Sequence, residues 1–142
     1  MTASNRVVKC AIVIYLAFAG VLISSAQVNK YENSSNYRSA LSALDNDDVK
    51  TGYDYLMKEI AVHPDNGYAY LYLSTIFLEY EDHKTALGCI NESIKYLPSK
   101  DKQTLSRALT IRAGIKRAID QNDSALSDLN EALALCPKDL DI

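Results

Sequence analysis

The chain has 142 residues, of which 48% are hydrophobic and 23% are charged, and its formal net charge is -3 at pH 7. This composition is typical of a folded soluble domain. The excess of acidic residues argues against a nucleic-acid-binding protein, because such proteins need a basic surface to neutralise phosphates.

The first 26 residues have the features of a secretory signal peptide. Arg6 and Lys9 precede an uncharged, mostly apolar run over 10–23. Small residues at 24–26 follow that run. The run is shorter than the roughly 20 apolar residues that a transmembrane helix needs. We therefore expect cleavage after Ala26, a periplasmic or secreted protein of a Gram-negative cell envelope, and no stable membrane insertion after cleavage. An uncleaved membrane anchor is the alternative.

A polar lead-in over 27–33 precedes six predicted helices. From Ser34 onward, apolar residues recur at helical spacing between turn-forming residues, and no stretch alternates at the period of a strand. We therefore expect an all-α chain. The predicted helices are Ser35–Leu44, Val49–Val62, Tyr68–Tyr80, Lys84–Tyr96, Lys102–Ile119 and Ser124–Leu135.

Regularly spaced prolines divide these helices into three pairs. Each proline has a small residue twelve positions before it: Gly52 and Pro64, Ala86 and Pro98, Ala125 and Pro137. The spacing is 34 residues and then 39, which indicates an insertion of five residues, expected at the start of the fifth helix. A period of this size is typical of helical repeats. The expected repeats are about 34–66, 67–99 and 100–137, with 138–142 as the start of a further repeat or a tail.

The repeated pattern resembles the tetratricopeptide repeat (TPR) family. The middle repeat matches at Tyr70, Leu73, Ser74, Phe77, Ala86, Ile90 and Pro98. The last repeat matches at Leu109, Ala113, Ala125, Leu129, Ala132 and Pro137, and the first at Ala40, Gly52, Leu56 and Pro64. Arg112 and Lys116 depart from the pattern, since they replace a leucine and an aromatic residue. The resemblance implies an α-α superhelix, or solenoid, of about three antiparallel helix pairs.

The resemblance also implies a non-enzymatic scaffold or adaptor that holds a protein or peptide segment in its concave groove. The groove positions carried over are Tyr68, Leu71, Thr75 and Leu78 in the middle repeat, and Arg107, Thr110, Gly114 and Arg117 in the last. Steps of three, four and three residues keep each set on one helix face. Residues 100–120 carry a net charge of +4, from six basic and two acidic residues. Two interpretations of these basic residues stay open. They anchor an acidic partner segment, or they belong to a solvated helix face with scattered charge.

The sequence contains no pattern that predicts catalysis, a cofactor or a metal. It has no Ser–His–acid arrangement, glycine-rich phosphate loop or Cys-x-x-Cys pair. His63 and His83 have no converging partners for a metal site. The acidic stretch over 45–48 is expected to be a capped turn, because lysine stands where a calcium loop requires glycine. We therefore expect a protein that is not an enzyme.

Two cysteines follow the expected leader, Cys89 and Cys136. They fall about two helical turns out of register, roughly 12 Å at 1.5 Å per residue, which is too far for a disulfide. We expect two separate, partly buried thiols.

Two rival hypotheses concern the end of the sequence. Residues 139–142 have the composition of the opening of a further repeat, which suggests the N-terminal repeat region of a longer secreted enzyme of peptidase or thiol-redox type. The second hypothesis is self-association through the C-terminal helix pair, because a last helix without a polar capping helix would leave an apolar face uncovered.

Overall fold

A computed structural model describes residues 29–137, and the expected leader over 1–26 and segment 138–142 lie outside this range. The described residues form six α-helices and no strand, which confirms the all-α prediction. Each helix begins and ends within two residues of its predicted bounds. The helices are α2 (Ser35–Asp45), α3 (Val49–Val62), α4 (Gly67–Glu79), α5 (His83–Tyr96), α6 (Lys102–Ala118) and α7 (Asn122–Leu135).

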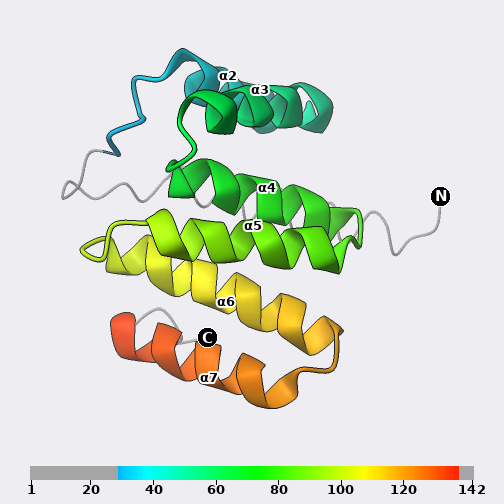
Figure 1. Cartoon of the computed structure of the whole chain (residues 1–142), viewed down its shortest axis with the longest axis vertical. Coiled ribbons are helices and arrows are strands. Elements are labelled where there is room, and N and C mark those ends of the chain that lie inside the picture. Colours follow the sequence, from blue (N-terminus) through cyan, green and yellow to red (C-terminus); the bar gives the residue numbers. More distant parts are fainter. Residues whose placement is uncertain (1–28, 138–142) are drawn as a thin grey trace. The chain divides into compact units, whose positions relative to one another are not determined.

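The structure divides within α3 into two compact units, whose described residues are 29–55 and 56–137. In the second unit α4 packs on α5, α5 on α6, and α6 on α7. Figure 1 shows these four helices side by side in chain order, with neighbours running in opposite directions. This arrangement confirms that adjacent helices pack in antiparallel pairs.

The same backbone turn joins the two helices of each pair. Its key residue lies in the left-handed region, with φ of 59° at Asp47, 60° at Glu81 and 62° at Asp120. The next residue donates its N–H to the carbonyl five positions earlier, which is a Schellman turn. These bonds join Asp48 to Ala43 (2.9 Å), Asp82 to Phe77 (3.0 Å) and Gln121 to Lys116 (2.8 Å). The three turns lie 34 and 39 residues apart, so the backbone repeats at the period of the prolines.

Aspartates at the ends of the first two turns also cap the helices that follow. The Asp48 carboxylate accepts a hydrogen bond from the Thr51 N–H at 3.1 Å, and Asp82 does the same for Thr85 at 3.1 Å. Hydrogen bonds from these threonines hold the pKa of both carboxyls below the ordinary value. The capped turn predicted over 45–48 is therefore confirmed.

Small residues are buried where the helices of a pair approach each other. Ala86 and Ala125 are buried, and a Cβ added to Gly52 would lie 2.6 Å from Leu44 Cδ2. A larger side chain at these positions would separate the helices, as the sequence predicts. An apolar core joins α4, α5 and α6 and includes Leu71, Ala86, Ile90, Leu97, Ala108, Ile111 and Ile115.

The five-residue insertion lengthens the start of α6, as predicted. Helix α6 has 17 residues, whereas its counterpart α4 has 13. Ser106 corresponds to Gly67, the first residue of α4, so the additional residues of α6 precede Ser106. Asp101 caps the lengthened helix by accepting a hydrogen bond from the Thr104 N–H at 3.1 Å.

Gly67 has a packing role that the sequence analysis did not predict. The predicted helices leave Gly67 between Val62 and Tyr68, but it is the first residue of α4 and is buried. An added Cβ would lie 2.7 Å from the Leu97 nitrogen and 2.9 Å from the Ser93 carbonyl oxygen. The chain therefore requires glycine here, because backbone atoms of the α5 terminus occupy the space of a side chain.

We expect Gly67→Ala to lower the free energy of unfolding by about 1–3 kcal/mol, because backbone must move to admit the methyl group. Urea denaturation followed by circular dichroism measures this change. Gly88→Ala is the matched control, since nothing lies within 4 Å of its added Cβ. That variant should gain about 0.5–1 kcal/mol from helix propensity. Equal stability of the two variants would refute the close approach at Gly67.

Candidate functional site

The four predicted site residues on α4 lie mostly against the core. Leu71 is 7% exposed and belongs to the apolar cluster, while Tyr68 and Leu78 are partly buried against it. Thr75 is half-buried, and its hydroxyl donates to the Tyr72 carbonyl at 2.7 Å. Leu71 therefore offers almost no surface to a partner. The predicted binding positions on α4 that keep some exposed surface are Tyr68, Thr75 and Leu78.

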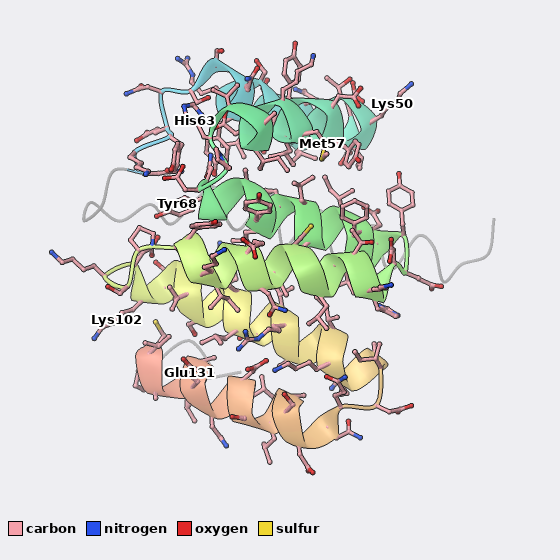
Figure 2. All side chains as sticks on the ribbon, in the orientation of Figure 1. Lys50, Met57, His63, Tyr68, Lys102 and Glu131 are labelled. Atoms are coloured by element: carbon pink, nitrogen blue, oxygen red, sulfur yellow. The ribbon has the colours of Figure 1, made fainter. Side chains whose placement is uncertain are left out.

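Tyr68 links the start of α4 to the start of α6. Its hydroxyl donates to Asp101 Oδ2 at 2.9 Å, while Asp101 Oδ1 accepts from the Thr104 N–H. Figure 2 shows Tyr68 and Lys102 at the same end of the helices. Burial, and then the hydrogen bond to Asp101, raise the pKa of Tyr68 far above the ordinary value. The phenol therefore stays protonated and positions the lengthened end of α6.

The four predicted site residues on α6 form a more open face. Thr110, Gly114 and Arg117 are exposed, and Arg107 is half-buried. The Thr110 hydroxyl donates to the Ser106 carbonyl at 2.9 Å. Helices α4 and α6 contact each other, so the two predicted sets lie on neighbouring helices of one unit.

Gly114 lies in the middle of α6 without a packing reason. No atom lies within 4 Å of the position that a Cβ would occupy. Glycine in a helix interior costs about 0.5–1 kcal/mol relative to alanine. The fold does not require this glycine, in contrast to Gly67. Its effect is to leave the helix backbone open to another molecule on the face that carries Thr110 and Arg117.

A buried ion cluster joins α6 to α7. Arg112 binds both oxygens of Asp128, through Nε at 2.8 Å and Nη2 at 2.7 Å, and Lys116 Nζ lies 2.8 Å from Asp128 Oδ2. Asp128 is 4% exposed. Burial alone would raise the pKa of Asp128, but hydrogen bonds from Arg112 and Lys116 outweigh it and hold this pKa below the ordinary value.

This cluster accounts for the two charged residues that depart from the repeated pattern. The middle repeat has Leu73 and Phe77 at the positions of Arg112 and Lys116, and Asp128 on α7 supplies the counter-charge of both. Asp128 also lies between the buried residues Ala125 and Ala132 at helical spacing, which was the available signal. Two of the basic residues counted over 100–120 are therefore structural, so fewer remain for a partner.

A second buried carboxylate organises the turn between α3 and α4. Glu59 is fully buried, and its Oε1 lies 2.9 Å from His63 Nδ1 and 2.9 Å from Asn66 Nδ2. Asn66 in turn caps α4 by accepting a hydrogen bond from the Ala69 N–H at 3.1 Å. Glu59 thus fixes the residue that caps α4. Its role is local structure, since the amide that it holds is the helix cap.

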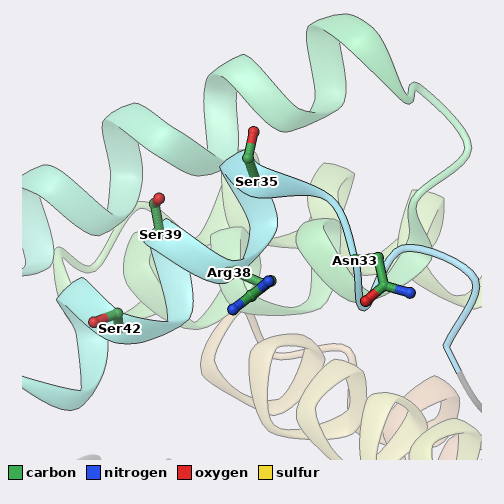
Figure 3. Close-up of a pocket in the computed structure, with 5 residues that line it drawn as sticks. All are labelled: Asn33, Ser35, Arg38, Ser39 and Ser42. Atoms are coloured by element: carbon green, nitrogen blue, oxygen red, sulfur yellow. The ribbon is translucent and has the colours of Figure 1, made fainter.

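A shallow polar hollow lies along α2 in the described part of the first unit. Its lining consists of Asn33, Ser35, Arg38, Ser39 and Ser42. Figure 3 shows that the polar ends of these side chains point in different directions. They do not converge on a common point, so the hollow lacks the geometry of a ligand site.

The two cysteines among the described residues are separate thiols. Cys89 and Cys136 are both partly buried and outside any disulfide, as predicted, and burial raises the pKa of the Cys89 thiol. Residues 29–137 hold no group of three His, Cys, Asp or Glu side chains that could bind a metal ion. Within the same range no helix is long and apolar enough to cross a membrane.

Comparisons of the chain with protein-family profiles, curated proteins and solved structures find no match. The resemblance to tetratricopeptide repeats therefore rests on the residues of this chain alone.

We expect Asp128→Ala to lower the free energy of unfolding by about 3–5 kcal/mol at pH 7, because it leaves two largely buried cations unpaired. Because its pKa is lowered in the folded state, the Asp128 carboxylate stabilises the fold above about pH 4. This contribution is lost as the pH falls through the folded pKa. Urea denaturation between pH 2 and 7 should therefore show a shallower acid dependence for Asp128→Ala than for the parent.

Glu131→Gln is the control for that measurement, since Glu131 is an exposed acid on the same helix (Figure 2). It should leave both the stability and its pH dependence close to those of the parent. A loss of stability in Glu131→Gln equal to that in Asp128→Ala would contradict a specific role for the buried cluster.

Proposed function

We propose that this chain is an exported, non-enzymatic scaffold of the tetratricopeptide type, which binds a segment of a partner protein on the face shared by α4 and α6. The repeated Schellman turns and the buried small residues at the same period support a repeat architecture. The basic start, apolar run and small residues over 6–26 support export.

The observation that carries the binding proposal is an open glycine on α6 beside the exposed Thr110 and Arg117, whereas Gly88 on α5 is equally open but lies outside the predicted groove positions. Gly114 lowers helix stability and nothing in the fold compensates for it, whereas a partner backbone or side chain can approach closely at a residue without Cβ. The exposed residues Thr110 and Arg117 lie three or four positions away, on the same face. Together they present a hydroxyl, an open backbone and a cation along one line.

The charges of this face favour an acidic partner segment. Arg112 and Lys116 are bound to Asp128, and the exposed guanidinium of Arg117 supplies positive charge on the predicted face, beside the half-buried Arg107. Guanidinium groups bind carboxylates through paired hydrogen bonds, which favours Asp, Glu or a terminal carboxylate in the partner. The partly buried Tyr68 and Leu78 on α4 supply adjacent apolar contact.

We expect Gly114→Ala to raise the stability of the chain by about 0.5–1 kcal/mol and to weaken partner binding, because a methyl group fills the open position. Gly88→Ala is the matched control, since it adds the same methyl group at an equally open position on α5. Capture from a cell-envelope extract, quantified by mass spectrometry, should recover the same partners with the parent and with Gly88→Ala. Gly114→Ala should recover them in reduced amount.

Arg107→Glu/Arg117→Glu tests the charge of the same face. Reversal of both charges should lower recovery of acidic partners by about tenfold or more, and higher salt should weaken the parent interaction. If this variant and Gly114→Ala retain every partner of the parent, the proposed α4 and α6 face is wrong.

The export proposal has its own test. The intact mass of the protein recovered from the envelope fraction should correspond to a chain that begins at Gln27. A recovered chain that retains residues 1–26 would contradict cleavage after Ala26.

A further inference from the structure

Helix α7 carries an exposed stripe of three leucines. Leu126, Leu129 and Leu133 are 59%, 39% and 41% exposed. Their spacing of three and four residues places them on one face of the helix. Contiguous exposed leucines of this kind mark an interaction surface more often than isolated apolar residues do.

The repeat supplies a template for what covers such a stripe. The residues 39 positions earlier are Leu87, Ile90 and Ile94 on α5, and they pack in one apolar cluster with Ala108, Ile111 and Ile115 on α6. Ile90 is fully buried there, whereas its counterpart Leu129 is 39% exposed. The α5 stripe is therefore covered by α6, which presents Ala108 and then isoleucine three and seven positions later.

A second copy of the chain is a poor cover for the α7 stripe. The α2 positions that correspond to Ala108, Ile111 and Ile115 are Ser35, Arg38 and Ser42, which are exposed and polar. Helix α2 of another copy would therefore place serine and arginine against leucine, which leaves polar groups desolvated.

Pairing of α7 with α7 of another copy is disfavoured by charge. The segment from Asp120 to Pro137 contains acidic residues and no lysine or arginine. Asp123 lies one turn before Leu126 and Asp120 lies just before α7, and both are exposed, so parallel pairing of two such helices would bring like charges together. The acidic residues at the start of α7 favour a basic partner.

We propose that the outer face of α7 docks a basic amphipathic helix of a partner protein, which presents an Ala-x-x-Ile-x-x-x-Ile stripe to the three leucines. This surface differs from the α4 and α6 face proposed above. The proposal for α7 does not depend on the proposal for the α4 and α6 face. The variants that test the two surfaces share no residue.

The probe is a synthetic peptide with the sequence of residues 102–119, because α6 carries the required stripe, five basic residues and no acidic residue. Fluorescence anisotropy should show binding of the labelled peptide to the full chain, and higher salt should weaken it. Leu126→Gln/Leu133→Gln should weaken binding by about tenfold or more, because glutamine keeps the helix but removes the apolar stripe.

Two controls make the result specific. A chain with Val62→Gln, which removes an exposed apolar residue from α3, should bind the peptide as the parent does. A peptide with serine in place of both isoleucines at positions 111 and 115 should not bind. Equal binding of the parent peptide to the parent and to Leu126→Gln/Leu133→Gln would overturn the proposal, as would no binding at millimolar concentration.

Sedimentation of the full chain tests the competing occupant. A monomer at tens of micromolar is the expected result. A dimer that Leu126→Gln/Leu133→Gln dissociates would identify a second copy as the cover of the stripe, and would overturn the proposal of a partner helix.

Discussion

The structure depends on a turn that reverses the chain within each helix pair at a residue in the left-handed region. Asp47, Glu81 and Asp120 all have φ near +60°, although none is glycine. The Schellman hydrogen bonds at these residues satisfy carbonyls that the end of a helix would otherwise leave unpaired. Since each turn sets the direction in which the next helix leaves, recurrence of the turn at fixed spacing places equivalent residues in equivalent surroundings. Burial of small residues at the helix contacts follows from that geometry.

This equivalence gives meaning to the places where the repeats differ. At one position the middle repeat has Gly67, which lies against backbone, and the last repeat has Ser106, whose hydroxyl donates to the Ala132 carbonyl at 2.9 Å. At two others the last repeat replaces apolar contact with the cluster of Arg112, Lys116 and Asp128. An apolar interface would hold two helices without directional bonds, whereas Arg112 fixes Asp128 through a bidentate pair. Because the cluster needs an ionised Asp128, this directional contact is lost when acid protonates the carboxylate.

The sequence predicted the helices and the insertion because both leave one-dimensional signals, namely the proline spacing and the helical period of apolar residues. It missed Gly67 and Asp128 because their roles depend on a second segment of chain. Glycine after Pro64-Asp65-Asn66 is an ordinary turn signal, and only the end of α5 makes it necessary. The spacing of the predicted site residues shows that each set lies on one helix face. Spacing alone does not show whether a neighbouring helix covers a residue on that face. Leu71 and Gly114 therefore have opposite exposures on equivalent faces.

Helix α7 differs from the other helices of its unit in how it is held. Its N-cap residue, Gln121, makes no side-chain cap hydrogen bond, and its leucine stripe is uncovered, so contacts with α6 supply its stability. Among those contacts the Asp128 cluster is a buried ionic link between the two helices. A ligand that binds the folded state alone stabilises that state by mass action. A helix docked on Leu126, Leu129 and Leu133 would therefore stabilise α7, since binding would bury these three exposed leucines. Binding on α4 and α6 would leave that stripe uncovered, so the two surfaces have separable effects on stability.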